Sequence, residues 1–74
     1  MKNSIDAAPN FPPLSEDEFY KTVEGALGAN ISPNIIAQEL ETAEGIVMDW
    51  GKRKHCPVSG SYRRFLAEKI EKLK

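Results

Sequence analysis

The most reactive side chains of the sequence stand together in one basic run, Lys52-Arg53-Lys54-His55-Cys56. Cations beside a cysteine favour its thiolate form, which is the form that acts as a nucleophile. Adjacent residues in a loop rarely hold a nucleophile and its base in hydrogen-bonding geometry, and no acid that could orient His55 stands nearby in the sequence. Pro57 follows at once and indicates a loop. We therefore expect no catalytic site here and no enzyme activity.

A second dense group of titratable side chains consists of Glu16, Asp17 and Glu18. Acids in this position suit the positive end of a helix dipole, so we interpret them as charges of a helix start rather than an acid–base pair. The chain has one His and one Cys in 74 residues, which is fewer than the ligands of a zinc site. We expect neither a metal ion nor another cofactor.

Charge is distributed unevenly along the chain, although the net charge is only −1. Residues 1–31 carry two lysines and five acids, residues 32–51 carry four acids and no base, and residues 52–74 carry eight bases and two acids. Clustered charge steers association with a charged partner. The candidate partner-binding residues are five cations of the C-terminal third and one aromatic residue near the N-terminus: Lys52, Arg53, Lys54, Arg63, Arg64 and Phe11.

Composition limits the compartment in which the chain works. No stretch approaches the roughly 18 to 20 apolar residues of a membrane span, and the first residues lack the apolar core of a secretory signal. A single cysteine cannot form an internal disulfide, which indicates a reducing environment. We expect a cytoplasmic protein with no membrane partner.

Prolines and caps divide the chain into a tail and a helical domain. Pro9, Pro12 and Pro13 favour extended backbone, and we predict a flexible proline-rich tail over residues 1–14 and one domain over residues 15–74. Ser15 and Glu18 have the spacing of a capping box, so a helix begins there, and Gly28 is its expected end.

Apolar spacing predicts the remaining helices. Ser32 and Pro33 are typical of a helix start, and a stripe of apolar residues runs from there to Trp50. Gly45 disfavours a helix interior, so periodicity leaves open whether residues 33–51 form one helix or two. Ser61 can cap a last helix. We predict an all-α domain of four short helices, whose inner faces combine these residues: Phe19, Val23, Ala26, Leu27, Ile36, Leu40, Ala43, Val47, Trp50, Tyr62, Phe65, Leu66, Ile70 and Leu73.

The segment from Ile36 to Trp50 resembles the helix-turn-helix of phage Cro and repressor-type regulators. The matching residues are Ala37 in the first helix, Leu40 three positions later, Val47 ten positions after the alanine, and Trp50. This resemblance covers about residues 19–73 and implies a helix-turn-helix-like arrangement. It also implies one candidate function, a sequence-specific DNA-binding repressor whose basic loop holds phosphates.

The positions that face DNA in that family are here Ala43, Glu44, Gly45, Met48 and Asp49. Phosphates repel the two carboxylates, and Ala and Gly side chains offer no hydrogen bond to a base. We name Glu44, Met48 and Asp49 the recognition face. Its acidity, together with a pI near 5.8, favours a protein target over DNA.

Short chains of this character are similar to phage-encoded factors that bind host RNA polymerase. That resemblance implies binding to the polymerase β and β′ subunits in the bacterial cytoplasm, inhibited initiation and read-through at terminators. We therefore predict a regulator of transcription with a protein target. The DNA-binding repressor stays open as an alternative, as does an antitoxin-like interaction module.

Overall fold

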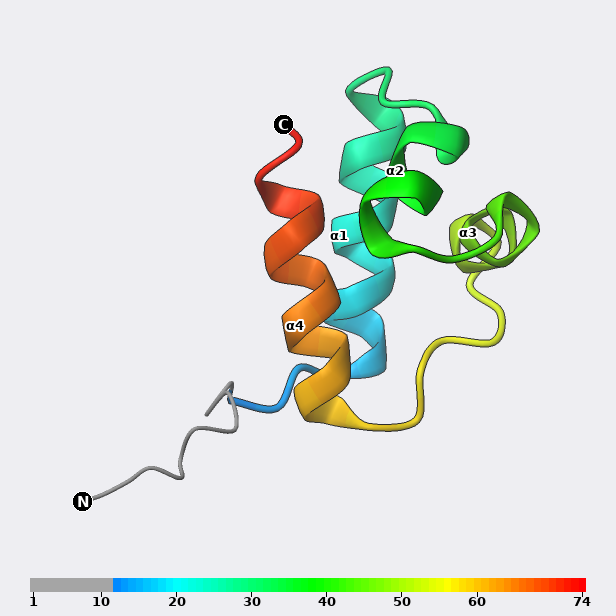
Figure 1. Ribbon diagram of the computed structural model, residues 1–74. Coiled ribbons are helices and arrows are strands. Elements are labelled where there is room, and N and C mark those ends of the chain that lie inside the picture. The colour runs from blue at the N-terminus through cyan, green and yellow to red at the C-terminus, as the bar shows by residue number, and fades with distance from the viewer. Residues whose placement is uncertain (1–11) are drawn as a thin grey trace.

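The computed structural model describes residues 12–74. Within this part of the chain there are four helices and no strand: α1 (Glu16–Gly28), α2 (Pro33–Leu40), α3 (Glu44–Gly51) and α4 (Gly60–Glu71) (Figure 1). The all-α prediction is confirmed. Phe11 and most of the predicted tail lie outside the described residues.

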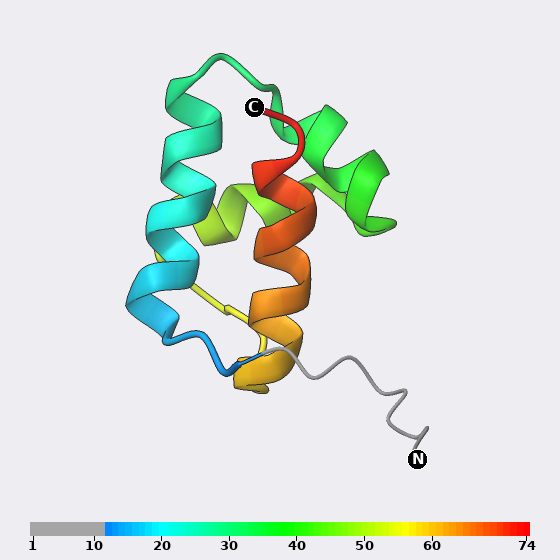
Figure 2. The same ribbon diagram turned by 90° about the vertical axis from the view of Figure 1, so that its left-hand side faces the viewer.

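Helices α1 and α4 lie side by side and start at the same end of the molecule (Figures 1 and 2). The segment before α1 joins these two starts, because the Leu14 amide donates a hydrogen bond to the Gly60 carbonyl oxygen at 3.0 Å. A Cβ atom on Gly60 would stand only 3.0 Å from the Pro13 Cβ, so glycine permits this approach. Leu14 is buried in the core, which places it in the domain rather than in the predicted tail.

Three helices end in a left-handed residue that is not glycine. Asn30, Glu41 and Arg53 have φ angles of 70°, 57° and 61°, whereas no glycine has a positive φ. Each lies in a Schellman motif, in which the next residue donates its amide back to a carbonyl five positions earlier. The predicted end of the first helix at Gly28 is confirmed, because α1 ends at Gly28; the left-handed residue that follows it is Asn30.

Residues 33–51 form two helices, which answers the question that periodicity left open. Glu41 takes the left-handed conformation at the end of α2, and the Thr42 amide bonds the Ala37 carbonyl at 2.9 Å. Ala43 then occupies the N-cap of α3 and is exposed. Its predicted place on the inner face is wrong, because the chain leaves the helix just before it.

The core is one cluster to which all four helices contribute. Its centre is an edge-to-face contact between Phe19 of α1 and Trp50 of α3, with ring centroids 5.0 Å apart. Gly51 allows α3 to approach α1, since a Cβ there would lie 3.0 Å from the Leu27 Cδ1 atom. The buried apolar residues are Leu14, Phe19, Tyr20, Val23, Ala26, Ile36, Ala37, Leu40, Val47, Trp50, Leu66, Ala67 and Ile70.

Two expectations for the last helix are wrong. Ser59, not Ser61, caps α4 by accepting the Tyr62 amide at 3.2 Å. Tyr62, expected on the inner face, has its side chain 50% exposed and lies outside the core cluster. None of the helices in the described part of the chain is long and apolar enough to cross a bilayer.

Candidate functional site

The loop between α3 and α4, residues 52–59, is attached to the rest of the domain by two part-buried hydrogen bonds. The Trp50 Nε1 group donates to the His55 carbonyl at 3.1 Å, and the Cys56 amide donates to the Tyr20 hydroxyl at 3.1 Å. Hydrogen bonding to the Cys56 side chain, followed by burial, raises the pKa of Tyr20. The basic run therefore occupies a fixed position next to α1.

Arg53 joins this loop to two acids of α1. Its Nε and Nη2 groups lie 2.9 and 3.1 Å from the Glu24 carboxylate, and its Nη1 group lies 2.8 Å from Asp17 Oδ1. Lys21 also pairs with Asp17, at 3.3 Å. The hydrogen bond from Arg53, followed by that from Lys21, lowers the pKa of Asp17, and the two acids raise the pKa of Arg53. One of the predicted partner-binding cations therefore has two internal partners.

Arg63 and Arg64 hold the segment before α1 and the start of α4 together. Arg63 donates from Nε to the Leu14 carbonyl at 2.7 Å and from Nη1 to the Pro57 and Val58 carbonyls at 2.7 and 3.0 Å. Arg64 donates from Nε to the Pro12 carbonyl at 3.1 Å. Both guanidinium groups thus take part in structural contacts.

Of the five predicted cations, Lys52 and Lys54 are the two that remain exposed without an ion-pair partner among residues 12–74. The structure therefore divides the proposed basic surface into three internally bonded arginines and two exposed lysines. One sequence signal for this division was overlooked. Asp17 and Glu24 are seven positions apart on α1, and so occupy one face of that helix.

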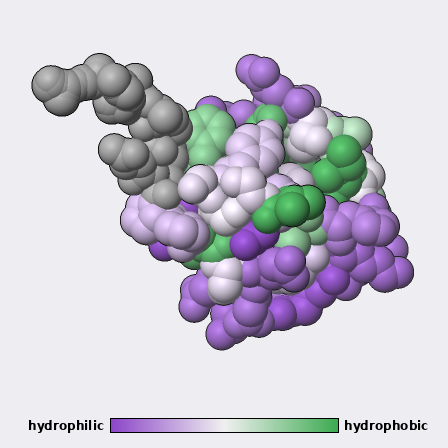
Figure 3. Space-filling view, turned by 90° about the horizontal axis from the view of Figure 1, so that it is seen from below, coloured by the Kyte–Doolittle hydropathy of each residue, from purple (hydrophilic) through white to green (hydrophobic). Residues whose placement is uncertain are grey.

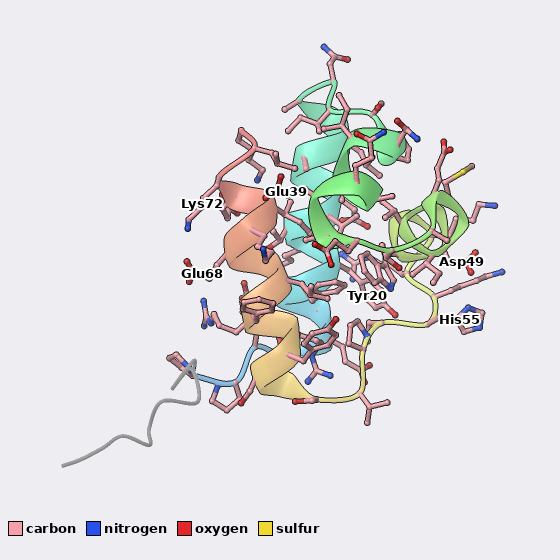
Figure 4. The ribbon with its side chains drawn as sticks, in the orientation of Figure 1. Tyr20, Glu39, Asp49, His55, Glu68 and Lys72 are labelled. Carbon is pink, nitrogen blue, oxygen red and sulfur yellow. The ribbon has the colours of Figure 1, made fainter. Side chains whose placement is uncertain are left out.

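The recognition face is exposed to solvent along α3. The side chains of Glu44 and Met48 are exposed, and Asp49 is half-buried at its edge. Asp49 Oδ2 lies 3.3 Å from His55 Nδ1 (Figure 4), so the structure supplies an acid beside His55 that the sequence analysis did not find. Among the described residues no hydrogen bond joins the His55 imidazole to the Cys56 thiol.

An open apolar groove separates α3 from the start of α4. Its volume is about 250 Å³, and the sequence analysis did not predict it. Apolar patches interrupt the polar surface on the face that carries the start of α4 (Figure 3). The residues that line the groove are Leu40, Thr42, Ile46, Trp50, His55, Pro57, Tyr62 and Leu66.

No family model, curated protein or solved structure matches this chain. The described part of the chain offers two exposed lysines on the α3–α4 loop, an acidic and apolar recognition face on α3, and an apolar groove beside it.

Proposed function

We propose that this chain is a small phage-type regulator of transcription that binds bacterial RNA polymerase in the cytoplasm of the host. In this proposal the helix-turn-helix-like unit, α2 with α3, is a scaffold for protein binding, and binding inhibits initiation and promotes antitermination. The choice of polymerase, through its β and β′ subunits, rests on the resemblance to phage factors of this size and character.

The observation that carries a protein target is the chemistry of α2 and α3. Residues 32–51 include four acids and no Lys or Arg, and the exposed surface of α3 includes Gly45, Ile46 and Met48. A helix that enters the major groove normally presents donors to bases and cations to phosphates. Arg53, the nearest arginine after α3, is bonded to Glu24 and Asp17. Exposed apolar patches instead mark protein interaction sites, and methionine is enriched in such interfaces.

The first test is recovery of partners with a tagged chain from bacterial lysate, divided into nuclease-treated and untreated halves. We expect RNA polymerase subunits in both halves. Recovery of polymerase or DNA in the untreated half alone would contradict a direct protein target and favour a DNA-binding repressor. Recovery of a different protein in both halves would support a protein target and contradict polymerase as its identity.

A second test uses purified polymerase with promoter and terminator templates. We expect the chain to reduce initiation and to increase read-through. The charge-reversing double variant Lys52→Glu with Lys54→Glu should weaken binding if the exposed lysines contact the enzyme. This pair is preferable to a variant at Arg53, since Arg53→Glu would place a third acid beside Asp17 and Glu24 and alter the fold itself.

A further inference from the structure

We propose that the groove between α3 and α4 is the docking site for a partner-protein segment that presents one large apolar side chain with lysine or arginine next to it. This inference rests on the proposed function in one respect, namely that the target is a protein. It adds the place on this chain where the target binds and the chemistry of the segment that binds there.

The groove has the size and lining of a site for a single side chain. Its volume of about 250 Å³ lies below the roughly 300 to 1,000 Å³ of small-molecule pockets. Buried Leu40, Trp50 and Leu66 form its inner part, and these residues belong to the core, so this part is fixed in place.

The outer walls of the groove are incompletely covered apolar side chains. Ile46 of α3 is 42% exposed and Tyr62 of α4 is 50% exposed. Tyr62 has its ring stacked on Phe65, with centroids 6.2 Å apart, and this contact orients it. An apolar side chain that entered between Ile46 and Tyr62 would remove both from water, which is the main favourable term in such association.

The charge beside the groove determines which charged residues the partner segment can carry next to its apolar side chain. Glu41 stands between the lining residues Leu40 and Thr42, and Glu44 stands two residues before the lining residue Ile46. Both carboxylates are exposed, and neither has an ion-pair partner in the described part of the chain; Lys54, next to the lining residue His55, is an exposed cation without one, so the two acids outnumber it. Acids that remain unneutralised favour a partner segment with basic residues and disfavour an acidic one.

Site-specific photo-crosslinking in the bacterial host tests the site and its occupant together. The photoreactive residue p-benzoylphenylalanine replaces Tyr62 in the groove, and in a matched control it replaces Ile35, which is 49% exposed on α2 and does not line the groove. Mass spectrometry then identifies the crosslinked segment. We expect strong crosslinks from position 62 to an apolar segment containing Lys or Arg, and weak ones from position 35.

The outcomes separate this inference from the proposed function. A basic apolar segment of a polymerase subunit supports both, and a segment of the same chemistry in another protein supports the groove while overturning polymerase as the target. Three results would overturn the groove as the docking site, whether or not polymerase is the target. They are crosslinks to residues 1–11 of the same chain, crosslinks to an acidic segment, and crosslinks of equal strength from positions 62 and 35.

The second test measures the affinity of this chain for the purified partner protein that the crosslinking identifies. We expect Ile46→Lys to weaken binding at least tenfold, whereas the matched control Ile35→Lys leaves it within twofold. The double variant Glu41→Lys with Glu44→Lys should weaken binding and reverse its dependence on salt. Circular dichroism checks that each variant is folded. Equal affinities for Ile46→Lys and Ile35→Lys would contradict the proposal.

Discussion

Asp17 and Glu24 of α1 have cationic partners, whereas the acids of α2, of the α2–α3 turn and of the first residue of α3 lack them. On the α1 side, Asp17 and Glu24 bind Arg53, and Lys21 adds a second cation to Asp17. On α2, the turn after it and the start of α3, a stretch that we call the α2–α3 face, Glu39, Glu41 and Glu44 are exposed with no ion-pair partner among the described residues. The fold neutralises one group of acids and leaves the other available to a partner.

This difference shows that a count of charges along a sequence does not locate a binding surface. The C-terminal third has the excess of cations. Its three arginines, however, donate hydrogen bonds to acids and carbonyl oxygens of the same chain: Arg53, Arg63 and Arg64. Two surfaces keep unbalanced charge, namely the acidic α2–α3 face and the exposed lysines Lys52 and Lys54 of the α3–α4 loop. Electrostatic steering depends on the charge that remains after folding, so the acidic face is available to a partner as well as the lysines.

The largest expected difference between the two sides concerns stability. Phe19 is fully buried against Trp50 on the α1 side, and Phe19→Ala should cost about 3 to 5 kcal/mol of unfolding free energy. Ile46→Ala on the α2–α3 face should cost less than about 1 kcal/mol, because its side chain is already 42% exposed. Urea unfolding followed by circular dichroism measures both. Equal losses would mean that the groove is part of the core.

The second prediction concerns cations and separates structural from exposed ones. Arg63→Met removes the donor to the Leu14, Pro57 and Val58 carbonyls, and should lower the unfolding free energy by about 2 kcal/mol. Lys54→Met, at an exposed cation with no ion-pair partner in residues 12–74, should change it by less than about 0.5 kcal/mol. The same urea titration compares the two, and a larger loss at Lys54 would contradict the division.

Local chemistry made much of the fold predictable. The Ser15 and Ser32 caps lie at the expected positions and accept the Glu18 and Ile35 amides. Trp50 is in the core as expected from its place on the apolar stripe. These features depend on residues within four positions of one another, so the spacing of residue types in the sequence predicts them directly.

The features that the sequence did not reveal include the left-handed positions. Glycine tolerates a left-handed backbone at the lowest cost, yet the residues in that conformation after α1, α2 and α3 are Asn30, Glu41 and Arg53. At Arg53 the side chain is held by Glu24 and Asp17, which are 29 and 36 residues away. Contacts at that separation leave no periodic trace in the sequence, and the groove, whose lining residues come from α2, α3, α4 and the connecting segments, was unpredictable for the same reason.

The turn between α2 and α3 provides the third prediction. Glu41 has φ 57° and ψ 47°, a conformation that costs free energy for any residue with a Cβ atom. Glu41→Gly should therefore raise the unfolding free energy by about 1 kcal/mol. The matched variant Glu39→Gly, inside α2, should lower it by about 1 kcal/mol. Thermal unfolding of the two variants should move in opposite directions, and a shift of the same sign in both would show that the turn is unstrained.

The smallest effect is expected at the paired acids, where it depends on pH. Arg53 lowers the pKa of Asp17 below its ordinary value of 3.8, so this interaction stabilises the fold above about that pH and is lost as the pH falls further and the carboxyl is protonated. Arg53→Gln should therefore lower the thermal midpoint slightly at pH 7 and have little effect near pH 2. Arg53 itself stays charged throughout, since its pKa is raised.

The control for this measurement is Lys52→Gln, because Lys52 is exposed and has no ion-pair partner among residues 12–74. Its thermal midpoint should follow that of the original chain at both pH values. If Arg53→Gln lowered the midpoint equally at pH 7 and pH 2, the stabilisation would come from packing of the arginine against the Tyr20 ring, 5.8 Å away, rather than from the acids. Aromatic contacts, and not ion pairs, would then stabilise the α1 side. The pairing of its acids with Arg53 would no longer be an energetic difference between it and the α2–α3 face.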